Sequence, residues 1–365
     1  MGAKAPEPAL PLEPGFYPRA WDPMIQNLSL PLLLVAFALA GAAVIFSSIR
    51  ATRLADIIAD RTSMGEAMAG GIILGGATSL AGVVVSVKAS LDGDASFAFS
   101  NAVGGIAAQT LFLAIADLIY RRANLEHAAA EPANLFQAVM LMILLSLPLC
   151  AIAGPDIAYF GVHPVSVVLF LTYLYGVRVS ARVSEEPMWR PVMTSETRTD
   201  EPEDEAEAGR SVTGPALRFA GLVVLMGLGG FVIAQVGSAF IERFGLRSGL
   251  VGSLITAVVT SLPEFVTTIV AVRRGALQLA VGGIIGGNTF DTLFLVASDV
   301  SLREGSLYHA VGTTDLYWLG TGLLMTGILL AGLIARQREG PARIGFESIA
   351  MLAVYAVAAT VEVLG

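Results

Sequence analysis

Apolar residues form runs of about 20 residues along most of the chain, and short polar segments separate them. A helix rises about 1.5 Å per residue, so a run of this length crosses the roughly 30 Å hydrocarbon core of a bilayer. Such runs favour helices over barrel strands, because a helix satisfies its own backbone polar groups in lipid. The pattern predicts an all-α polytopic membrane protein with about ten spans, at residues 28–49, 66–90, 95–119, 134–154, 156–177, 216–241, 249–272, 277–299, 314–335 and 344–364.

The chain also repeats itself. Residues 70–117 align with residues 252–299 at a constant offset of 182, with no gap and with 16 of 48 positions identical. Ordinary amino-acid usage predicts identity at roughly a tenth of positions by chance. Each half of the chain has five predicted spans. Because five is an odd number, the second half enters the membrane in the orientation opposite to that of the first half. Inverted repeats are typical of alternating-access transporters, whose substrate sites lie near the midplane where the repeats meet.

Charge patterning divides the chain and orients it. We predict a polar N-terminal tail, a first five-helix repeat, an acidic cytoplasmic linker and a second five-helix repeat, at residues 1–27, 28–178, 179–214 and 215–365. Placing both termini outside the cytoplasm leaves 16 of the 22 Lys and Arg residues in cytoplasmic segments. The positive-inside rule favours that orientation.

Composition excludes other classes of protein. A mean hydropathy of +0.72, with 14% charged residues, is too apolar for a soluble domain of 365 residues. The net charge of −8 comes with no basic stripe, so no nucleic-acid partner is expected. The single cysteine, Cys150, cannot form an intrachain disulfide and is predicted to be buried.

Candidate chemistry is concentrated in the second copy. Glu264 lies in the middle of a span, where a carboxylate is functional by default. Thr260 and Ser261 precede it by four and three residues, so their hydroxyls share its helix face. Pro263 removes an amide that would bond the carbonyl of Val259. This stretch therefore offers a carboxylate, hydroxyls and a backbone carbonyl together.

The next span adds Asn288 and Asp291, spaced by three residues on one helix face. Oxygen ligands without His or Cys suit Na⁺ or Ca²⁺ rather than zinc or copper. No nucleophile with an adjacent base appears in either copy, so an enzyme is not expected.

These motifs resemble a known family. Thr260-Ser261-Leu262-Pro263-Glu264 and Gly286-Gly287-Asn288-Thr289-Phe290-Asp291 are similar to the second alpha-repeat of the sodium/calcium exchanger superfamily, closer to the bacterial sodium/calcium antiporters than to the cation/proton branch. The resemblance implies an antiporter of the plasma (inner) membrane with Na⁺ and Ca²⁺ as substrates and no cofactor. It makes Glu264 and Asp291 the central metal ligands, accompanied by the cation ligands Thr260, Ser261, Thr78, Ser79 and Gln109; Asn288 is added from its spacing.

The first copy departs from the family pattern. Gly82 stands where the family has a glutamate, and Gly105 and Gly287 stand where it has serines. Two carboxylates therefore remain where the family commonly has three. Three interpretations stay open: a Na⁺/Ca²⁺ antiporter, an antiporter of the same fold that uses H⁺ or monovalent cations, and a degenerate paralogue without coupled transport. Oligomeric state is not predicted.

The repeat also makes geometric predictions. Spans 66–90 and 249–272 are expected to break beside Thr78 and Thr260, and residues 78–82, 105–109, 260–264 and 287–291 are expected to meet near the bilayer centre. Four acidic residues near span ends complete the expectations. Asp117 and Asp299 are interpreted as capping or anchoring groups, and Glu347 and Glu362 as interfacial ones.

Overall fold

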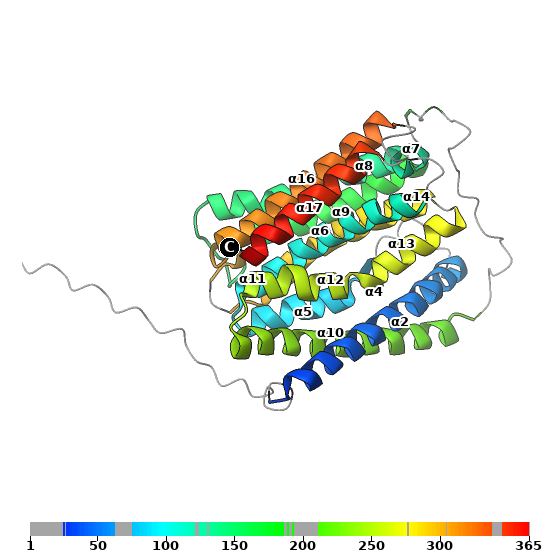
Figure 1. Cartoon of the computed structure of the whole chain (residues 1–365). Helices are drawn as coiled ribbons and strands as arrows, with labels where there is room; N and C mark the ends of the chain where they lie inside the picture. The colour runs from blue at the N-terminus through cyan, green and yellow to red at the C-terminus, as the bar shows by residue number, and fades with distance from the viewer. Residues whose placement is uncertain are drawn as a thin grey trace, which may run out of the picture.

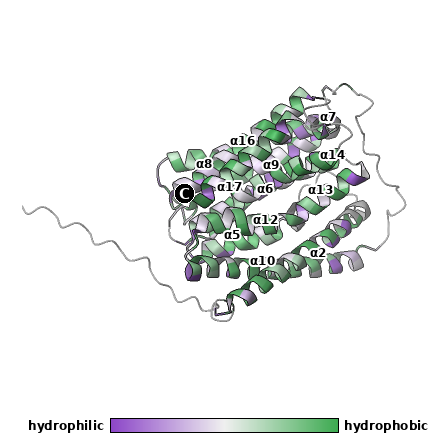
Figure 2. Cartoon of the chain, viewed as in Figure 1, coloured by the Kyte–Doolittle hydropathy of each residue, from purple (hydrophilic) through white to green (hydrophobic). Residues whose placement is uncertain are grey.

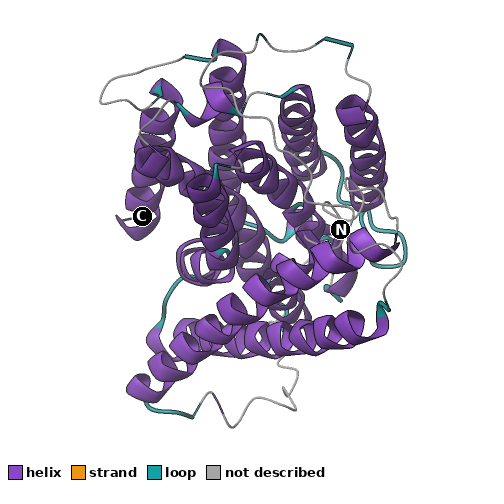
Figure 3. Ribbon diagram, turned by 90° about the vertical axis from the view of Figure 1, so that its right-hand side faces the viewer, coloured by secondary structure: helices purple, strands orange, loops and turns teal. Residues whose placement is uncertain are grey.

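The structure, a computed structural model, is built from helices. It describes residues 25, 27–62, 75–120, 124–129, 131–185, 188–189, 192, 211–275, 277–303, 305–337 and 345–364. Among the described residues, β-structure is limited to one isolated antiparallel bridge between Tyr159 and Val162, and every regular element is helical (Figure 3). Apolar residues dominate the helices along their length (Figure 2).

The helices follow the predicted spans. In the first half they are α2 (Leu30–Thr62), α4 (Gly75–Thr78), α5 (Leu80–Leu91), α6 (Ala95–Tyr120), the short α7 (Leu125–Ala128), α8 (Pro132–Ala153) and α9 (Pro164–Glu185). In the second half they are α10 (Thr213–Phe244), α11 (Ser248–Leu250), the π-helix η3 (Val251–Thr256), α12 (Ala257–Thr260), α13 (Leu262–Arg274), α14 (Leu277–Asp291), α15 (Leu293–Ser301), the short η4 (Leu307–His309), α16 (Thr313–Ala335) and α17 (Phe346–Leu364).

These helices confirm the predicted membrane fold. Within the described residues, eight helices are long and apolar enough to span a membrane, and the bent pair Ser248–Thr260 and Leu262–Arg273 makes a ninth. The remaining predicted span, 66–90, is described from residue 75 onward as α4 and the apolar α5. Most of the predicted linker lies outside the described residues, so the division into four segments stays a prediction.

The two halves are related by inversion. Helix α5 follows α4 across a break at Ser79, and α13 follows α12 across a break at Ser261, the position equivalent to Ser79 at the offset of 182. In Figure 1 the path from α4 to α5 runs in the opposite direction to the path from α11 through α12 to α13. The broken spans beside Thr78 and Thr260 are thus confirmed, and they lie antiparallel.

Helix α6 lies at the centre of the bundle. In its most apolar window, 78% of the residues are buried inside the protein, the largest share of any spanning helix in the described residues. Gly104 allows a close approach to the second half, because a Cβ atom at this position would lie 2.5 Å from the Cα atom of Ser253 on η3. Close helix contact at small residues is typical of packing in membranes. The α6 side chains are therefore held against both repeats.

Asp117, at the end of α6, ties the first half to the second. Its carboxylate is fully buried and accepts a hydrogen bond from the amide of Leu125, eight residues on, at 2.8 Å. It also accepts bonds from the amide of Gly345 at 3.3 Å and the hydroxyl of Ser348 at 2.8 Å, where α17 begins.

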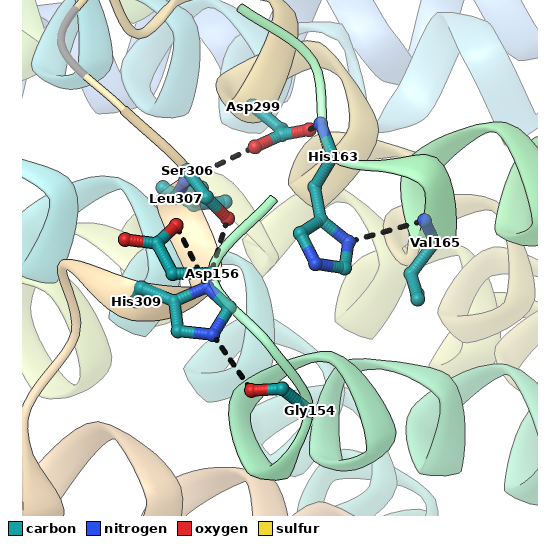
Figure 4. Close-up of polar contacts among 8 residues, drawn as sticks. All are labelled: Gly154, Asp156, His163, Val165, Asp299, Ser306, Leu307 and His309. Atoms are coloured by element: carbon teal, nitrogen blue, oxygen red, sulfur yellow. Dashed lines mark hydrogen bonds and ion pairs between the residues drawn. The ribbon is translucent and has the colours of Figure 1, made fainter. Parts of the chain in front are cut away.

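Asp299 repeats this arrangement in the other half (Figure 4). Its buried carboxylate accepts bonds from the amide of Leu307 at 3.0 Å, the amide of His163 at 2.8 Å and the hydroxyl of Ser166 at 2.7 Å, where α9 begins. Each of these three partners is offset by 182 from a partner of Asp117. Both aspartates therefore cap a helix of the opposite repeat, which agrees with the capping interpretation.

Three expectations about other residues are wrong. Glu347 and Glu362 are not interfacial but fully buried, at 0% and 1% exposure. Asn124 donates to the carboxylate of Glu347 at 2.5 Å, and the indole of Trp318 donates to that of Glu362 at 2.8 Å. Asn124, directly before α7, and Trp318 on α16 supply these donors, so position along the span did not reveal the burial. Cys150, expected to be buried, is exposed on α8.

Candidate cation site between the two repeats

The candidate site is built around the two helix breaks. Ser79 and Ser261 occupy the breaks with nearly identical backbone conformations, φ −88° and ψ −1° against φ −94° and ψ 0°. The second span bends by 43° at its break, and Glu264 lies in the first turn of α13 directly after it. Pro263 is not the sole cause of such a break, because the first copy breaks at the same place with Ala81 in the equivalent position.

A hydroxyl of the first repeat lies beside both carboxylates. Ser79 donates a hydrogen bond to Oε1 of Glu264 at 3.4 Å and lies close to the carboxylate of Asp291. Thr78 bonds to Glu264 as well. Both acids are nearly inaccessible to solvent, with 5% exposure for Glu264 and 1% for Asp291. The first repeat therefore contributes hydroxyls to a pair of carboxylates that belongs to the second.

Gln109 and Asp291 meet directly. Nε2 of Gln109 donates to Oδ2 of Asp291 at 2.5 Å and lies 3.5 Å from the hydroxyl of Ser261. The two residues occupy equivalent positions of the two copies, at the offset of 182. Two symmetry-equivalent side chains can touch only near the pseudo-twofold axis that relates the two repeats. The contact between Gln109 and Asp291 therefore places the site where the two halves meet.

Four buried oxygen atoms around this point have no hydrogen-bond partner among the described residues. They are Oε1 of Gln109, Oε2 of Glu264, Oδ1 of Asn288 and Oδ1 of Asp291. An unsatisfied buried oxygen costs free energy, and each such atom in a folded protein calls for an explanation. A bound cation would satisfy these oxygens, because Na⁺ and Ca²⁺ are held by carboxylate and amide oxygens.

The two remaining predicted ligands make other contacts. Thr260 donates its hydroxyl proton to the carbonyls of Thr256 and Ala257 at 2.9 and 3.2 Å. A hydroxyl that donates in this way keeps its lone pairs for a cation. Asn288 donates to the hydroxyl of Thr110 at 2.9 Å, which joins α14 to α6. Among the described residues, the hydrogen bonds of Thr260 and Asn288 reach neither carboxylate.

All four predicted segments converge. A Cβ atom at Gly105 would lie 3.5 Å from Oγ of Ser261 and 3.8 Å from Oδ2 of Asp291. A Cβ atom at Gly287 would lie 3.1 Å from Oε1 of Gln109. Gly105 and Gly287, which stand where the resemblance predicts serines, therefore line the same site and contribute no hydroxyl to it.

Sequence reasoning missed two contributors. Thr110 is identical to Thr292, its equivalent in the second copy, but this identity does not reveal its bond to Asn288 on another helix. Phe294 was also visible only as a match to Phe112, yet its ring lies against Gly82, where a Cβ atom would be 2.5 Å from Cε2 of the ring. Spacing identifies residues that share a helix face but not the side chain that faces them from another helix.

Comparison with known proteins agrees with the geometry. The family model described as sodium/calcium exchanger protein matches residues 32–181 and 214–364. The inner membrane protein YrbG of Escherichia coli (strain K12) is 27% identical over 323 residues, which cover 87% of this chain and 91% of that protein.

Two solved structures share the fold. The sodium-calcium exchanger NCX_Mj, soaked with Na⁺ and Sr²⁺, superposes with a TM-score of 0.58 at 16% identity, over 91% of this chain and 99% of that one. The H⁺/Ca²⁺ exchanger CAX superposes with a TM-score of 0.59 at 16% identity, over 91% of this chain and 86% of that one. The family model covers most of the chain, in two matches that follow the two repeats. The chain is a member of the sodium/calcium exchanger protein family.

Proposed function

We propose that the protein is a secondary antiporter that exchanges Na⁺ for Ca²⁺ by alternating access. The observation that carries this proposal is the pair of buried carboxylates, Glu264 and Asp291, with the Ser79 hydroxyl beside them and with buried oxygens that have no hydrogen-bond partner among the described residues. Calcium takes six to eight oxygen ligands. The carboxylates, the Gln109 and Asn288 amides and the hydroxyls of Thr78, Ser79, Thr260 and Ser261 can supply that number.

The geometry also suits alternating access. The site lies where two inverted repeats meet, and each repeat brings a broken helix to it. Helix breaks at a midplane site supply freed backbone groups to an ion while the rest of each helix stays intact. We place both termini outside the cytoplasm, as the distribution of Lys and Arg indicates, in an inner (plasma) membrane like that of YrbG.

A second candidate couples Ca²⁺ to H⁺ instead. The observation that favours it is the near-complete burial of both carboxylates, because desolvation and like charge both favour protonated carboxyl groups. The fold is shared equally with an exchanger named for each coupling ion, so the fold does not decide between them.

Transport in proteoliposomes separates the candidates. We expect ⁴⁵Ca²⁺ uptake to follow an outward Na⁺ gradient at constant pH and to be small with an outward H⁺ gradient in Na⁺-free medium. The converse result would assign H⁺ as the coupling ion. If neither gradient drives uptake while Ca²⁺ still binds, the chain is a degenerate paralogue and coupled exchange is refuted.

A further inference from the structure

We propose that Phe294 sets the charge of the site: its ring takes the volume that a side chain at position 82 would need, so the site keeps two carboxylates and exchanges one Ca²⁺ for two Na⁺ without moving net charge. This inference rests on the proposed function. It begins from the internal repeat, in which Gly82 is the position equivalent to Glu264. A symmetric site would hold a glutamate at both positions.

The space beside Gly82 is filled. A Cβ atom on Gly82 would lie 2.5 Å from Cε2 and 3.0 Å from Cζ of the Phe294 ring; the first distance is too short for two carbon atoms, so the ring would have to shift. Phe294 is buried, at 3% exposure, and its ring packs edge-on against Phe290 with centroids 6.5 Å apart. A side chain at position 82 could therefore be accommodated only if this buried ring moved.

The symmetry mate of Phe294 behaves differently. Phe112 packs in a tilted arrangement against Phe265, next to Glu264 in the chain, with ring centroids 4.7 Å apart. In that copy the aromatic ring and a glutamate coexist. The glycine at position 82 and the ring of Phe294 are thus complementary, and we interpret the two as a matched pair.

The backbone of Gly82 is also engaged. Its carbonyl oxygen accepts a hydrogen bond from Nδ2 of Asn101 at 3.2 Å. Asn101 is fixed in turn, because Thr256 donates to its Oδ1 at 2.7 Å and its amide also donates to Ser86 at 2.9 Å. Position 82 therefore contributes no side chain to the site, and its carbonyl already has a partner.

The charge count follows. Glu264 and Asp291 are the two carboxylates at the site, and Gln109, facing Asp291, is a neutral amide. Nowhere in the described part of the chain do three His, Cys, Asp or Glu side chains gather closely enough to hold a metal ion. Lys88, six residues after Gly82, forms an ion pair with Asp92. With both carboxylates ionised, the described residues therefore give the site a formal charge of −2.

A buried site tolerates little uncompensated charge, because desolvation of an unpaired ion is costly. One Ca²⁺ neutralises two carboxylates, and so do two Na⁺; a third Na⁺ would leave a buried positive charge. Exchange of one Ca²⁺ for two Na⁺ therefore transfers no net charge. A cycle that moved one net charge would change the equilibrium Ca²⁺ accumulation ratio about 50-fold per 100 mV.

The first test measures that ratio in proteoliposomes whose potential is clamped with K⁺ and valinomycin. With a fixed Na⁺ gradient, we expect the same final ⁴⁵Ca²⁺ accumulation at 0 and −100 mV. A change approaching 50-fold would overturn the electroneutral cycle. Failure of Na⁺ to drive any uptake would instead refute the proposed function, and the second test then decides the role of Phe294 without transport.

The second test measures Ca²⁺ affinity of the purified full chain in detergent by calorimetry. Phe294→Ala removes the ring beside position 82 and adds no charge. The Ca²⁺ affinity of the double variant Gly82→Glu/Phe294→Ala is therefore compared with that of the single variant Phe294→Ala. We expect the double variant to bind Ca²⁺ at least about tenfold more tightly, because a third carboxylate joins the ion. Equal affinities would overturn the inference.

A control separates Phe294 from any other phenylalanine. Gly82→Glu alone should lower the melting temperature, because the new side chain collides with the ring. Phe294→Ala should restore the melting temperature of Gly82→Glu, whereas Phe112→Ala, at the symmetry-related position, should not. Equal rescue by both alanine variants would show that position 82 is not blocked by Phe294.

Discussion

Single atoms in the first repeat support the charges of the second. The hydroxyl of Ser79 donates to Glu264 and lies close to Asp291, while the amide of Gln109 donates to Asp291. The copy that lost its carboxylates has kept the neutral groups that orient the remaining ones. Substitutions in the two copies are therefore expected to differ in severity, since only the second removes charge.

Removing a charge should have the larger effect. We expect Glu264→Gln to weaken Ca²⁺ binding by at least about 100-fold and to abolish Ca²⁺ uptake, because half of the formal charge disappears while the site stays buried. Asp156→Asn is the matched control, since the Asp156 side chain is 67% exposed. Calorimetry measures the Ca²⁺ affinity of the two variants, and ⁴⁵Ca²⁺ uptake measures their transport. An unchanged affinity in Glu264→Gln would show that Glu264 is not a ligand.

Removing the Ser79 hydroxyl should have an intermediate effect on Ca²⁺ binding. Hydrogen bonds to charged groups contribute about 1.5–3 kcal/mol, so Ser79→Ala should weaken Ca²⁺ binding by about 10- to 100-fold without unfolding the protein. Ser146→Ala is the control. Among the described residues, the Ser146 hydroxyl donates to the carbonyl of Met142 on its own helix, away from the carboxylates. If the two variants bind Ca²⁺ alike, Ser79 does not orient the carboxylates.

The helices show which elements the two copies still share. Both copies break at the serine of the Thr-Ser pair, but only the second has a proline two residues later. The break is therefore a property of the shared motif and its packing. The proline's particular contribution is to remove one amide, which leaves the carbonyl of Val259 without its helical donor.

This comparison yields a prediction for Pro263→Ala. The variant is expected to keep the 43° bend and to bind Ca²⁺ within about threefold of the wild type, because Ala81 is compatible with the equivalent break. The cryo-EM structure of the variant and calorimetric titration measure the two properties. A loss of affinity as large as that of Glu264→Gln would make the Val259 carbonyl an essential ligand.

Helix periodicity and the internal repeat together predicted the spans, the two breaks and the meeting of segments 105–109 and 287–291. All three depend on spacing along one helix or on symmetry between two copies, and sequence carries both directly. The contact between Phe294 and Gly82 depends on how α15 packs on α5, and spacing does not specify it. The same limit explains Glu347 and Glu362, whose donors Asn124 and Trp318 come from other elements.

For the whole molecule, orientation in the membrane is the next property to test. The Lys and Arg distribution predicts that Asp156 faces the outside and Trp189 the cytoplasm, and both side chains are exposed. In a Cys150→Ala background, an impermeant thiol reagent added to intact cells should label Asp156→Cys and not Trp189→Cys. The reverse pattern would invert the topology.

The paired aspartates have a consequence for how the chain assembles. Asp117 and Asp299 each fasten the start of the last helix in the opposite half, so neither half supplies all the partners of its own polar groups. The polypeptide link between the halves should then be dispensable. We expect fragments 1–200 and 201–365, produced in the same cell, to copurify and to recover Ca²⁺ uptake. The double substitution Asp117→Asn/Asp299→Asn should lower their copurification, whereas Asp156→Asn should not. If the fragments copurify and recover uptake, each half behaves as a separate subunit and the covalent link between them is not needed for assembly.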